Sequence, residues 1–144
     1  MTKYQKPDAL TMRLVNPLIA TLTKLGLSVR GAHVLAVRGR KTGTMQEVPV
    51  NPVEVEGMRY LVAPRGDTHW VRNLRVTGAA ELRIGQRREH IQTREIDNAG
   101  KPLVLRAYLR RWKREIGKFF GMDDRASDED LTRIAPDHPV FQIT

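Results

Sequence analysis

Two short turns of the chain combine glycine with cationic side chains, a combination that suits the binding of an anion. In residues 39–43 (GRKTG), Arg40 and Lys41 lie between two glycines, which let the backbone approach a ligand closely. In residues 64–67 (PRGD), Arg65 precedes an expected helix, whose N-terminal end favours an anion. A solvated hairpin tip is the simpler interpretation of the first turn by itself. Two such turns on neighbouring strands favour a site for phosphate or carboxylate groups.

A third segment, residues 70–74 (WVRNL), places Trp70, Asn73 and Leu74 on one face of that expected helix. A tryptophan on such a face is ordinarily part of the core. An asparagine beside it is less ordinary, because a buried amide needs hydrogen-bond partners. We therefore count this face as a candidate part of the site.

Several other chemistries lack their residues. Lys41 and Thr42 resemble the end of a nucleotide-binding P-loop, but Leu35 stands where the opening glycine belongs. Neither a G-x-G-x-x-G nor a G-x-S-x-G motif occurs, and the lack of cysteine excludes thiolate nucleophiles, thiolate zinc sites and iron–sulfur clusters. The four histidines lack metal-ligand spacing, so we expect no metal and assign no catalytic side chain.

The net charge of +9, mostly from arginine, indicates an anionic partner, which is a small ligand, nucleic acid or an anionic membrane surface. The expected helix at residues 103–116 has a cationic side, so a nucleic-acid or membrane-surface binding module is one alternative function. We favour a solvated face that the acidic residues of 123–130 partly neutralise. No nucleic-acid partner is therefore expected, and peripheral membrane contact by the N-terminal segment stays open.

Hydrophobic periodicity and turn residues predict many short strands beside longer helices. The predicted strands are residues 33–38, 45–56, 58–63, 81–84, 87–96 and 140–143. Pro49 and Pro52 place the second strand at a sheet edge or bend it, and Gly85 turns a hairpin. The predicted helices are residues 10–25, 70–76 capped by Asp67, 103–116, and a short one opened by Ser127 and ended before Pro136. These elements predict an α+β fold on a barrel-like antiparallel sheet.

Length and composition predict one domain over residues 1–144. With 40% apolar and 28% charged residues, the composition is typical of a globular protein. No apolar run approaches the ~20 residues of a membrane-spanning helix, and residues 1–10 lack the apolar stretch of a signal peptide. We therefore expect a cytoplasmic protein.

The segments GRKTG (39–43), VPV (48–50), APRG (63–66) and WVRNL (70–74), in this order and spacing, resemble the deazaflavin-dependent nitroreductase family. Its members are oxidoreductases of actinobacteria with a small antiparallel split β-barrel (FMN-binding-like) and flanking helices, and they use the deazaflavin coenzyme F-420. The resemblance covers the middle half of the chain and extends loosely to residues 139–141. It implies an oxidoreductase that transfers hydride from the reduced ring to a small acceptor, such as a quinone or a nitro compound.

The coenzyme joins a flat ring to a phosphate-linked tail that ends in several glutamates, which suits a cationic chain. The coenzyme-binding residues implied by the resemblance are Arg40, Lys41, Thr42, Gly43, Gln46, Ala63, Pro64, Arg65, Gly66, Trp70 and Asn73. Among these, Arg40, Lys41 and Arg65 are implied to hold the phosphate and the tail carboxylates, assisted by the backbone of Thr42 and Gly43. Trp70 and Asn73 are implied to border the ring, alongside the backbone of Ala63, Pro64 and Gly66.

One departure from the family pattern concerns Gln46, which stands where family members often carry a further arginine. The contact of that arginine with the tail is therefore in question here, and Arg38 and Arg72 are nearby cations that can replace it.

The acceptor side and the assembly are less defined. Tyr108, Trp112 and Phe120 are candidates for contact with the acceptor, although membership of the core is favoured for each. A split-barrel protein for FMN, haem or a lipid is a further alternative function, with FMN the less favoured cofactor. Split barrels are commonly dimeric, so a homodimer stays open.

Overall fold

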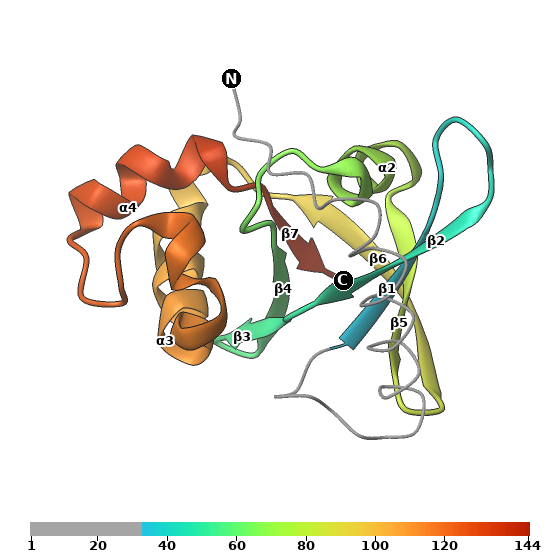
Figure 1. The fold of residues 1–144 in the computed structure, drawn as a ribbon, viewed down its shortest axis with the longest axis horizontal. Coiled ribbons are helices and arrows are strands. Elements are labelled where there is room, and N and C mark those ends of the chain that lie inside the picture. Colours follow the sequence, from blue (N-terminus) through green and yellow to red (C-terminus); the bar gives the residue numbers. More distant parts are fainter. Residues whose placement is uncertain (1–32) are drawn as a thin grey trace. The chain divides into compact units, whose positions relative to one another are not determined.

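The structure, a computed structural model, describes residues 33–144, without the side chains of residues 113–118 (Figure 1). The helix predicted for residues 10–25 lies outside the described residues. The described chain forms two compact units: unit 1 comprises residues 52–68 and 94–144, and unit 2 comprises residues 33–51 and 69–93. A single domain over residues 1–144 stays a prediction.

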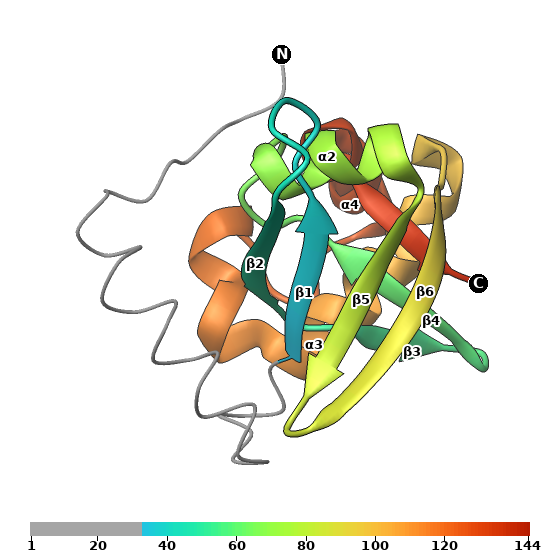
Figure 2. The ribbon, with the colours of Figure 1, turned by 90° about the vertical axis from the view of Figure 1, so that its right-hand side faces the viewer.

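Unit 2 contains an antiparallel sheet. Its strands are β1 (His33–Arg38), β2 (Met45–Val50), β5 (Ala79–Ile84) and β6 (Arg87–Glu95), the last two residues of β6 belonging to unit 1. They follow the order β2-β1-β5-β6 and lie side by side in Figure 2. The strand predicted for residues 33–38 is confirmed, and those predicted for 81–84 and 87–96 are confirmed with β5 beginning two residues earlier and β6 ending one residue earlier.

The register of this sheet is fixed by its turns and pairings. Ala36 of β1 lies opposite both Glu47 of β2 and Glu81 of β5, so the two glutamates share one face of the sheet. Between β5 and β6, a tight hairpin turns at Gly85, whose φ is 59°. The predicted hairpin around Gly85 is confirmed.

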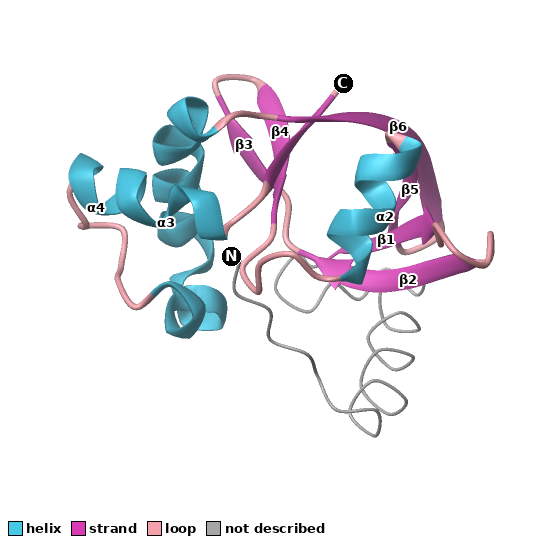
Figure 3. Cartoon of the chain, turned by 90° about the horizontal axis from the view of Figure 1, so that it is seen from above, coloured by secondary structure: helices cyan, strands magenta, loops and turns pink. Residues whose placement is uncertain are grey.

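Helix α2 (His69–Thr77) packs against β1 and β5 (Figure 3). Its buried residues are Val71, Asn73 and Leu74, which are the apolar face plus one amide. The helix begins one residue earlier than predicted, so Thr68, and not Asp67, directly precedes it.

Unit 1 contains three further strands of the seven-stranded antiparallel sheet that the described residues form, and most of the helices described. In the sheet, β4 (Met58–Val62) lies between β3 (Val53–Val55) and β7 (Val140–Ile143). The helices are η1 (Asn98–Gly100), α3 (Lys101–Phe120), α4 (Asp128–Ile134) and η2 (Ala135–Asp137). Helix α3 packs against β3, β4 and α4. No helix in the described part of the chain is long and apolar enough to cross a membrane.

The ends of the helices follow local chemistry. Ser127 caps α4, because its Oγ accepts a hydrogen bond from the Asp130 N–H at 3.1 Å, as predicted. Helix α3 begins at Lys101, earlier than predicted, and includes Pro102 in its first turn. Proline is tolerated there because the first N–H groups of a helix have no partner within it.

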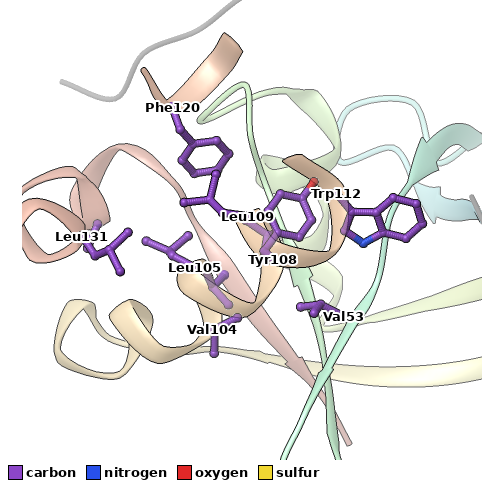
Figure 4. Packing of buried hydrophobic residues seen from close by; sticks show 11 residues of the cluster. Val53, Val104, Leu105, Tyr108, Leu109, Trp112, Phe120 and Leu131 are labelled. Carbon is purple, nitrogen blue, oxygen red and sulfur yellow. The ribbon is translucent and has the colours of Figure 1, made fainter. Parts of the chain in front are cut away.

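The core of unit 1 centres on one face of α3 (Figure 4). Leu105, Tyr108, Leu109 and Trp112 follow helical spacing and are all buried, which confirms the predicted apolar face. Phe120 meets Tyr108 edge-on, with ring centroids 6.0 Å apart. The three acceptor-side candidates, Tyr108, Trp112 and Phe120, therefore belong to this core.

The strand predicted for residues 45–56 is in fact two strands that belong to different units. Strand β2 ends at Val50 and β3 begins at Val53, with Pro52 between them. Proline has no N–H for a sheet ladder, so it favours an interruption at that point. Pro49 remains inside β2, which is an edge strand, as the prolines of residues 45–56 predict.

Candidate functional site

The loop between β1 and β2, residues 39–44, is closed by its own hydrogen bonds. Gly39 N donates to Thr44 O at 2.9 Å, and Gly43 N donates to Gly39 O at 2.9 Å. Thr44 N donates to Thr42 Oγ1 at 3.2 Å, and Arg38 Nη1 donates to Gly43 O at 2.8 Å. The Gly43 N–H is thus already used inside the loop. A ligand would therefore meet the side chains of the loop and not this amide.

The two glycines of the loop are needed for different reasons. Gly43 has a φ of 76°, a left-handed conformation that glycine adopts without strain. Gly39 is buried, and a Cβ at this position would lie 2.9 Å from Gln46 Nε2 and 3.1 Å from Thr42 Oγ1. The packing of the loop therefore explains Gly39 without the approach of a ligand.

Three predicted site residues of unit 2 form one hydrogen-bonded network. Arg40 Nη1 donates to Asn73 Oδ1 at 2.7 Å, and the Arg40 backbone N–H donates to the same oxygen at 3.1 Å. Asn73 Nδ2 donates to Gln46 Oε1 at 3.3 Å. Asn73 is 1% exposed, and these contacts are the partners that its buried amide needs.

The two cations of this loop have no anionic partner among the described residues. Arg40 is half-buried and Lys41 is exposed at the tip of the loop. No carboxylate of the described residues pairs with Arg40, whose side-chain partner is a neutral amide, and Lys41 has no ion-pair or hydrogen-bond partner there. An anion that reached the loop would thus meet two uncompensated positive charges.

The second predicted turn, residues 63–66, lies in unit 1. Ala63 N donates to Pro139 O at 2.9 Å, and Gly66, with a φ of 84°, donates its N–H to Ala63 O at 3.3 Å. The Arg65 guanidinium carbon lies 5.8 Å from the Phe119 ring centroid. Among the described residues, Arg65 Nε is buried without a hydrogen-bond partner, a state that is unfavourable unless water or a ligand accepts from it.

A buried histidine supports the same turn. His138 is 3% exposed, and its Nδ1 lies 3.2 Å from Ala63 O. Its ring stacks on Phe120, with the centroids 4.1 Å apart. The sequence gives no sign of this contact, because the two residues are 75 positions apart.

A charge cluster that the sequence did not indicate lies on β2 and β5. Arg83 pairs with Glu81 on its own strand and with Glu47 of β2 at 2.8 Å. The hydrogen bond from Arg83 lowers the pKa of Glu81, helped by the charges of Arg83 and Arg88 and opposed by burial. Burial lowers the pKa of Arg83, but its hydrogen bonds and the charges of the two glutamates raise it more. The cluster therefore stays charged at neutral pH and ties β2 to β5.

The cationic side of α3 is partly neutralised within unit 1. Arg106 Nη2 lies 2.8 Å from Asp128 Oδ1, and Arg110 Nε lies 3.8 Å from Asp124 Oδ2. Lys101 is buried and donates its Nζ to a backbone carbonyl at 3.0 Å. These contacts agree with the favoured interpretation of this helix, and they contrast with the uncompensated charges at the β1–β2 loop.

Solved structures with similar folds identify the architecture. The F-420-H2 dependent reductase FDR-A is 18% identical to this chain, with a TM-score of 0.56 over 80% of this chain and 95% of that chain. A domain-swapped dimer is 17% identical, with a TM-score of 0.58 over 96% and 100% of the chains. A NimC/NimA family protein from Clostridium acetobutylicum is 15% identical, with a TM-score of 0.52 over 89% and 80%. The predicted split β-barrel of the α+β class is confirmed by these similarities.

Sequence comparison identifies the family. No curated protein matches the chain. The profile of the F-420H(2)-dependent quinone reductase family matches residues 13–120, which is more than half of the chain. The fold and this match define an F-420-dependent reductase, as predicted. The chain belongs to the F-420H(2)-dependent quinone reductase family, and its cofactor is coenzyme F-420.

The described residues fit this cofactor chemically. Its phosphate and glutamate carboxylates are anions, and the β1–β2 loop carries Arg40 and Lys41 with uncompensated charge. The Nε of Arg65, which has no partner within residues 33–144, is a further donor suited to an anion.

Proposed function

We propose that the β1–β2 loop binds the phosphate and the tail carboxylates of coenzyme F-420 through Arg40 and Lys41. Arginine presents a planar fork that matches phosphate and carboxylate, and lysine adds a mobile charge. The lack of a carboxylate partner for either cation among the described residues supports this assignment. Arg65 is the third proposed tail contact, supported by its buried Nε, which has no hydrogen-bond partner among the described residues.

We assign the ring contacts from the sequence pattern. Ala63, Pro64, Gly66 and Trp70 border the ring in this proposal, and the backbone of Thr42 assists at the phosphate. The Gly43 N–H is a weaker candidate than the sequence indicates, because it donates to Gly39 O. Asn73 joins the site through its hydrogen bonds with Arg40, and Gln46 joins it through Asn73.

When bound, the reduced coenzyme supplies a hydride to a small acceptor, a quinone or a nitro compound in this proposal. The chain itself contributes binding and orientation: it holds the tail at the loop and so fixes the position of the ring against the acceptor. We assign no acid–base side chain to this step.

The family match over residues 13–120 carries the proposal, and a binding titration tests it. We would follow tryptophan fluorescence while adding F-420, and FMN in a parallel titration. The chain has two tryptophans, Trp70 of α2 and the core residue Trp112. Quenching by F-420 should survive in Trp112→Phe and disappear in Trp70→Phe.

A control variant and an activity assay complete the titration. Arg87→Ala changes an exposed arginine of β6 and should leave F-420 binding unchanged. Reduced F-420 should be oxidised by the protein in the presence of a soluble quinone or nitroaromatic. Binding of FMN alone, or no oxidation with any acceptor, would overturn the proposed reaction.

We propose a homodimer as the second feature of the function, because a solved domain-swapped dimer has a similar fold. Light scattering after size-exclusion chromatography measures the mass. A mass near 16.4 kDa, that of one chain, at all concentrations would exclude the dimer.

A further inference from the structure

Asn73 is a polar residue in an apolar position, and both ends of its amide are used by the protein. The residue is 1% exposed on α2, between the buried apolar residues Val71 and Leu74. Its oxygen accepts from the Arg40 backbone N–H at 3.1 Å and from Arg40 Nη1 at 2.7 Å. Its nitrogen donates to Gln46 Oε1 at 3.3 Å. These bonds leave little of the Asn73 amide for direct contact with a ligand.

The partners of Asn73 also fix which way its amide faces. The oxygen faces Arg40 because an arginine side chain and a backbone N–H are both donors and need an acceptor. The nitrogen faces Gln46, whose side chain can supply the acceptor oxygen. Gln46 in turn is held close to the loop, since its Nε2 would lie 2.9 Å from a Cβ at Gly39.

The chemical nature of the partner determines what Arg40 can do. An aspartate in place of Asn73 would offer an acceptor of the same shape, but it would also neutralise the guanidinium. The neutral amide uses one side-chain N–H of Arg40 and the backbone N–H, and it leaves the positive charge and the other guanidinium donors in place. The arrangement therefore restrains a cation without compensating it.

We propose that Asn73 is a positioning residue that holds Arg40 as an uncompensated cation for a phosphate group, and that Gln46 orients the Asn73 amide for this purpose. The inference rests on the proposed function in one respect, namely that the phosphate belongs to F-420. It replaces a direct contact of Asn73 with the ring by an action through Arg40. It also gives Gln46 a role of its own, as the acceptor that keeps Asn73 Oδ1 turned toward Arg40.

Asn73→Asp is the decisive variant, because it keeps the shape and the acceptor oxygen toward Arg40 and adds a negative charge there. It also replaces the Nδ2 donor toward Gln46 with an oxygen, to which the Gln46 amide can donate after turning over. We expect its affinity for F-420 to fall about tenfold or more, since hydrogen bonds to charged groups are the strong ones. We expect binding of a deazaflavin ring compound without phosphate and tail to change less than about twofold. We expect the thermal midpoint to be unchanged or raised, because the variant adds an ion pair. Equal loss for both compounds would mean that Asn73 contacts the ring, and unchanged F-420 affinity would mean that Arg40 is not restrained for an anion; either result overturns the proposal.

A double-mutant cycle tests that Asn73 acts through Arg40. The affinity for F-420 is measured for Arg40→Ala, Asn73→Leu and the combined variant, all checked for folding by circular dichroism. If Asn73 acts through Arg40, Asn73→Leu should weaken binding in the wild-type background and have little effect after Arg40→Ala. Losses that add in the combined variant would contradict the proposal.

Gln46 provides a conservative pair of variants. Gln46→Glu keeps an acceptor toward Asn73 Nδ2 and should retain the Asn73 orientation, although its added negative charge weakens anion binding in a salt-dependent way. Gln46→Leu removes the acceptor, and its loss of affinity should be independent of salt. A loss in Gln46→Leu that persists in the Arg40→Ala background would contradict the role assigned to Gln46.

Inorganic pyrophosphate separates this inference from the proposed function. Its binding, followed as a rise in the thermal midpoint, should be present in the wild type and lost in Arg40→Ala and Asn73→Asp. If pyrophosphate behaves in this way and F-420 does not bind, the positioning role stands and the proposed function is wrong. If pyrophosphate stabilises the wild type and Asn73→Asp equally, the positioning role is wrong, whatever F-420 does.

Discussion

The β1–β2 loop and helix α3 are both rich in cations, but their arginines have different partners. Arg40 donates to the neutral amide of Asn73, whereas Arg106 of α3 lies 2.8 Å from the carboxylate of Asp128. The first arrangement leaves the positive charge without a counter-charge, and the second places a carboxylate beside it. The density of cations along a sequence therefore does not locate an anion site. The site is located by the charge of the groups that the cations contact.

The largest expected effect compares these two arginines directly. Arg40→Ala should weaken F-420 binding by about tenfold to a hundredfold, because hydrogen bonds to charged groups contribute about 1.5–3 kcal/mol. Arg106→Ala should change the affinity less than about twofold, since its charge is already paired. Isothermal titration calorimetry of both variants measures the difference. Similar losses in the two variants would mean that the pairing of an arginine does not decide whether it binds the coenzyme.

A smaller effect is expected from the packing beneath Arg40. Gly39→Ala places a Cβ 2.9 Å from Gln46 Nε2 and should displace that side chain from Asn73. We expect a loss of F-420 affinity of about threefold to tenfold. Gly43→Ala is the matched control: it has open space around the Cβ but a φ of 76°, so it should lower stability by about 1 kcal/mol. If Gly43→Ala reduced affinity more than Gly39→Ala, the contact with Gln46 would not be the cause.

Arg83 lies in the same unit as Arg40 but, unlike it, has two acidic partners, Glu47 and Glu81. The folded-state pKa of Glu81 lies below its ordinary value of 4.5, so its ion pair contributes fully to stability above that pH. The contribution should be lost as the pH falls below about 4.5 and Glu81 takes up a proton. Thermal unfolding from about pH 7 to about pH 3 measures this, with Glu81→Gln as the comparison. The variant should be less stable at neutral pH and should lose less stability on acidification; parallel curves would refute the assignment.

The smallest effect is expected at the surface pair on α3. Asp128→Asn removes the carboxylate next to Arg106. The Asp128 side chain is 88% exposed, so solvent screens the ion pair and limits its contribution to stability. We expect a change in unfolding free energy below about 1 kcal/mol and no change in F-420 affinity. Urea denaturation measures the first quantity. A gain in F-420 affinity after Asp128→Asn would show that freeing Arg106 creates a second anion site.

Much of the local structure could be predicted because it depends on neighbours in the chain. The spacing of Leu105, Tyr108 and Trp112 predicts their common buried face on α3, and Gly85 predicts a hairpin. Ser127 predicts the start of α4. The order and spacing of the segments between residues 39 and 74 were also enough to predict the split-barrel fold and the F-420-dependent family, which the comparisons confirm.

Other features depend on segments that meet only after folding. The sequence shows that Gln46 stands where the family pattern has an arginine. It does not show the contact of Gln46 with Asn73, because that contact requires β2 and α2 to lie together. The contact of His138 with Ala63 and the pairing of Arg83 with Glu47 likewise join distant segments. The separation of β2 from β3 at Pro52 was open in the sequence, since a proline can bend a strand or end it.

The sequence by itself determined the family, the cofactor, the helical faces and the presence of two cationic glycine turns, because residue type and spacing along the chain carry this information. Only the tertiary structure shows which of the cations have an anionic partner. Hydrogen bonds and ion pairs act over about 3–4 Å, so the partner of a side chain is set by the packing of elements and not by its neighbours in sequence. For Arg40 that partner is Asn73, a neutral residue 33 positions away, and for this reason the loop can serve as an anion site.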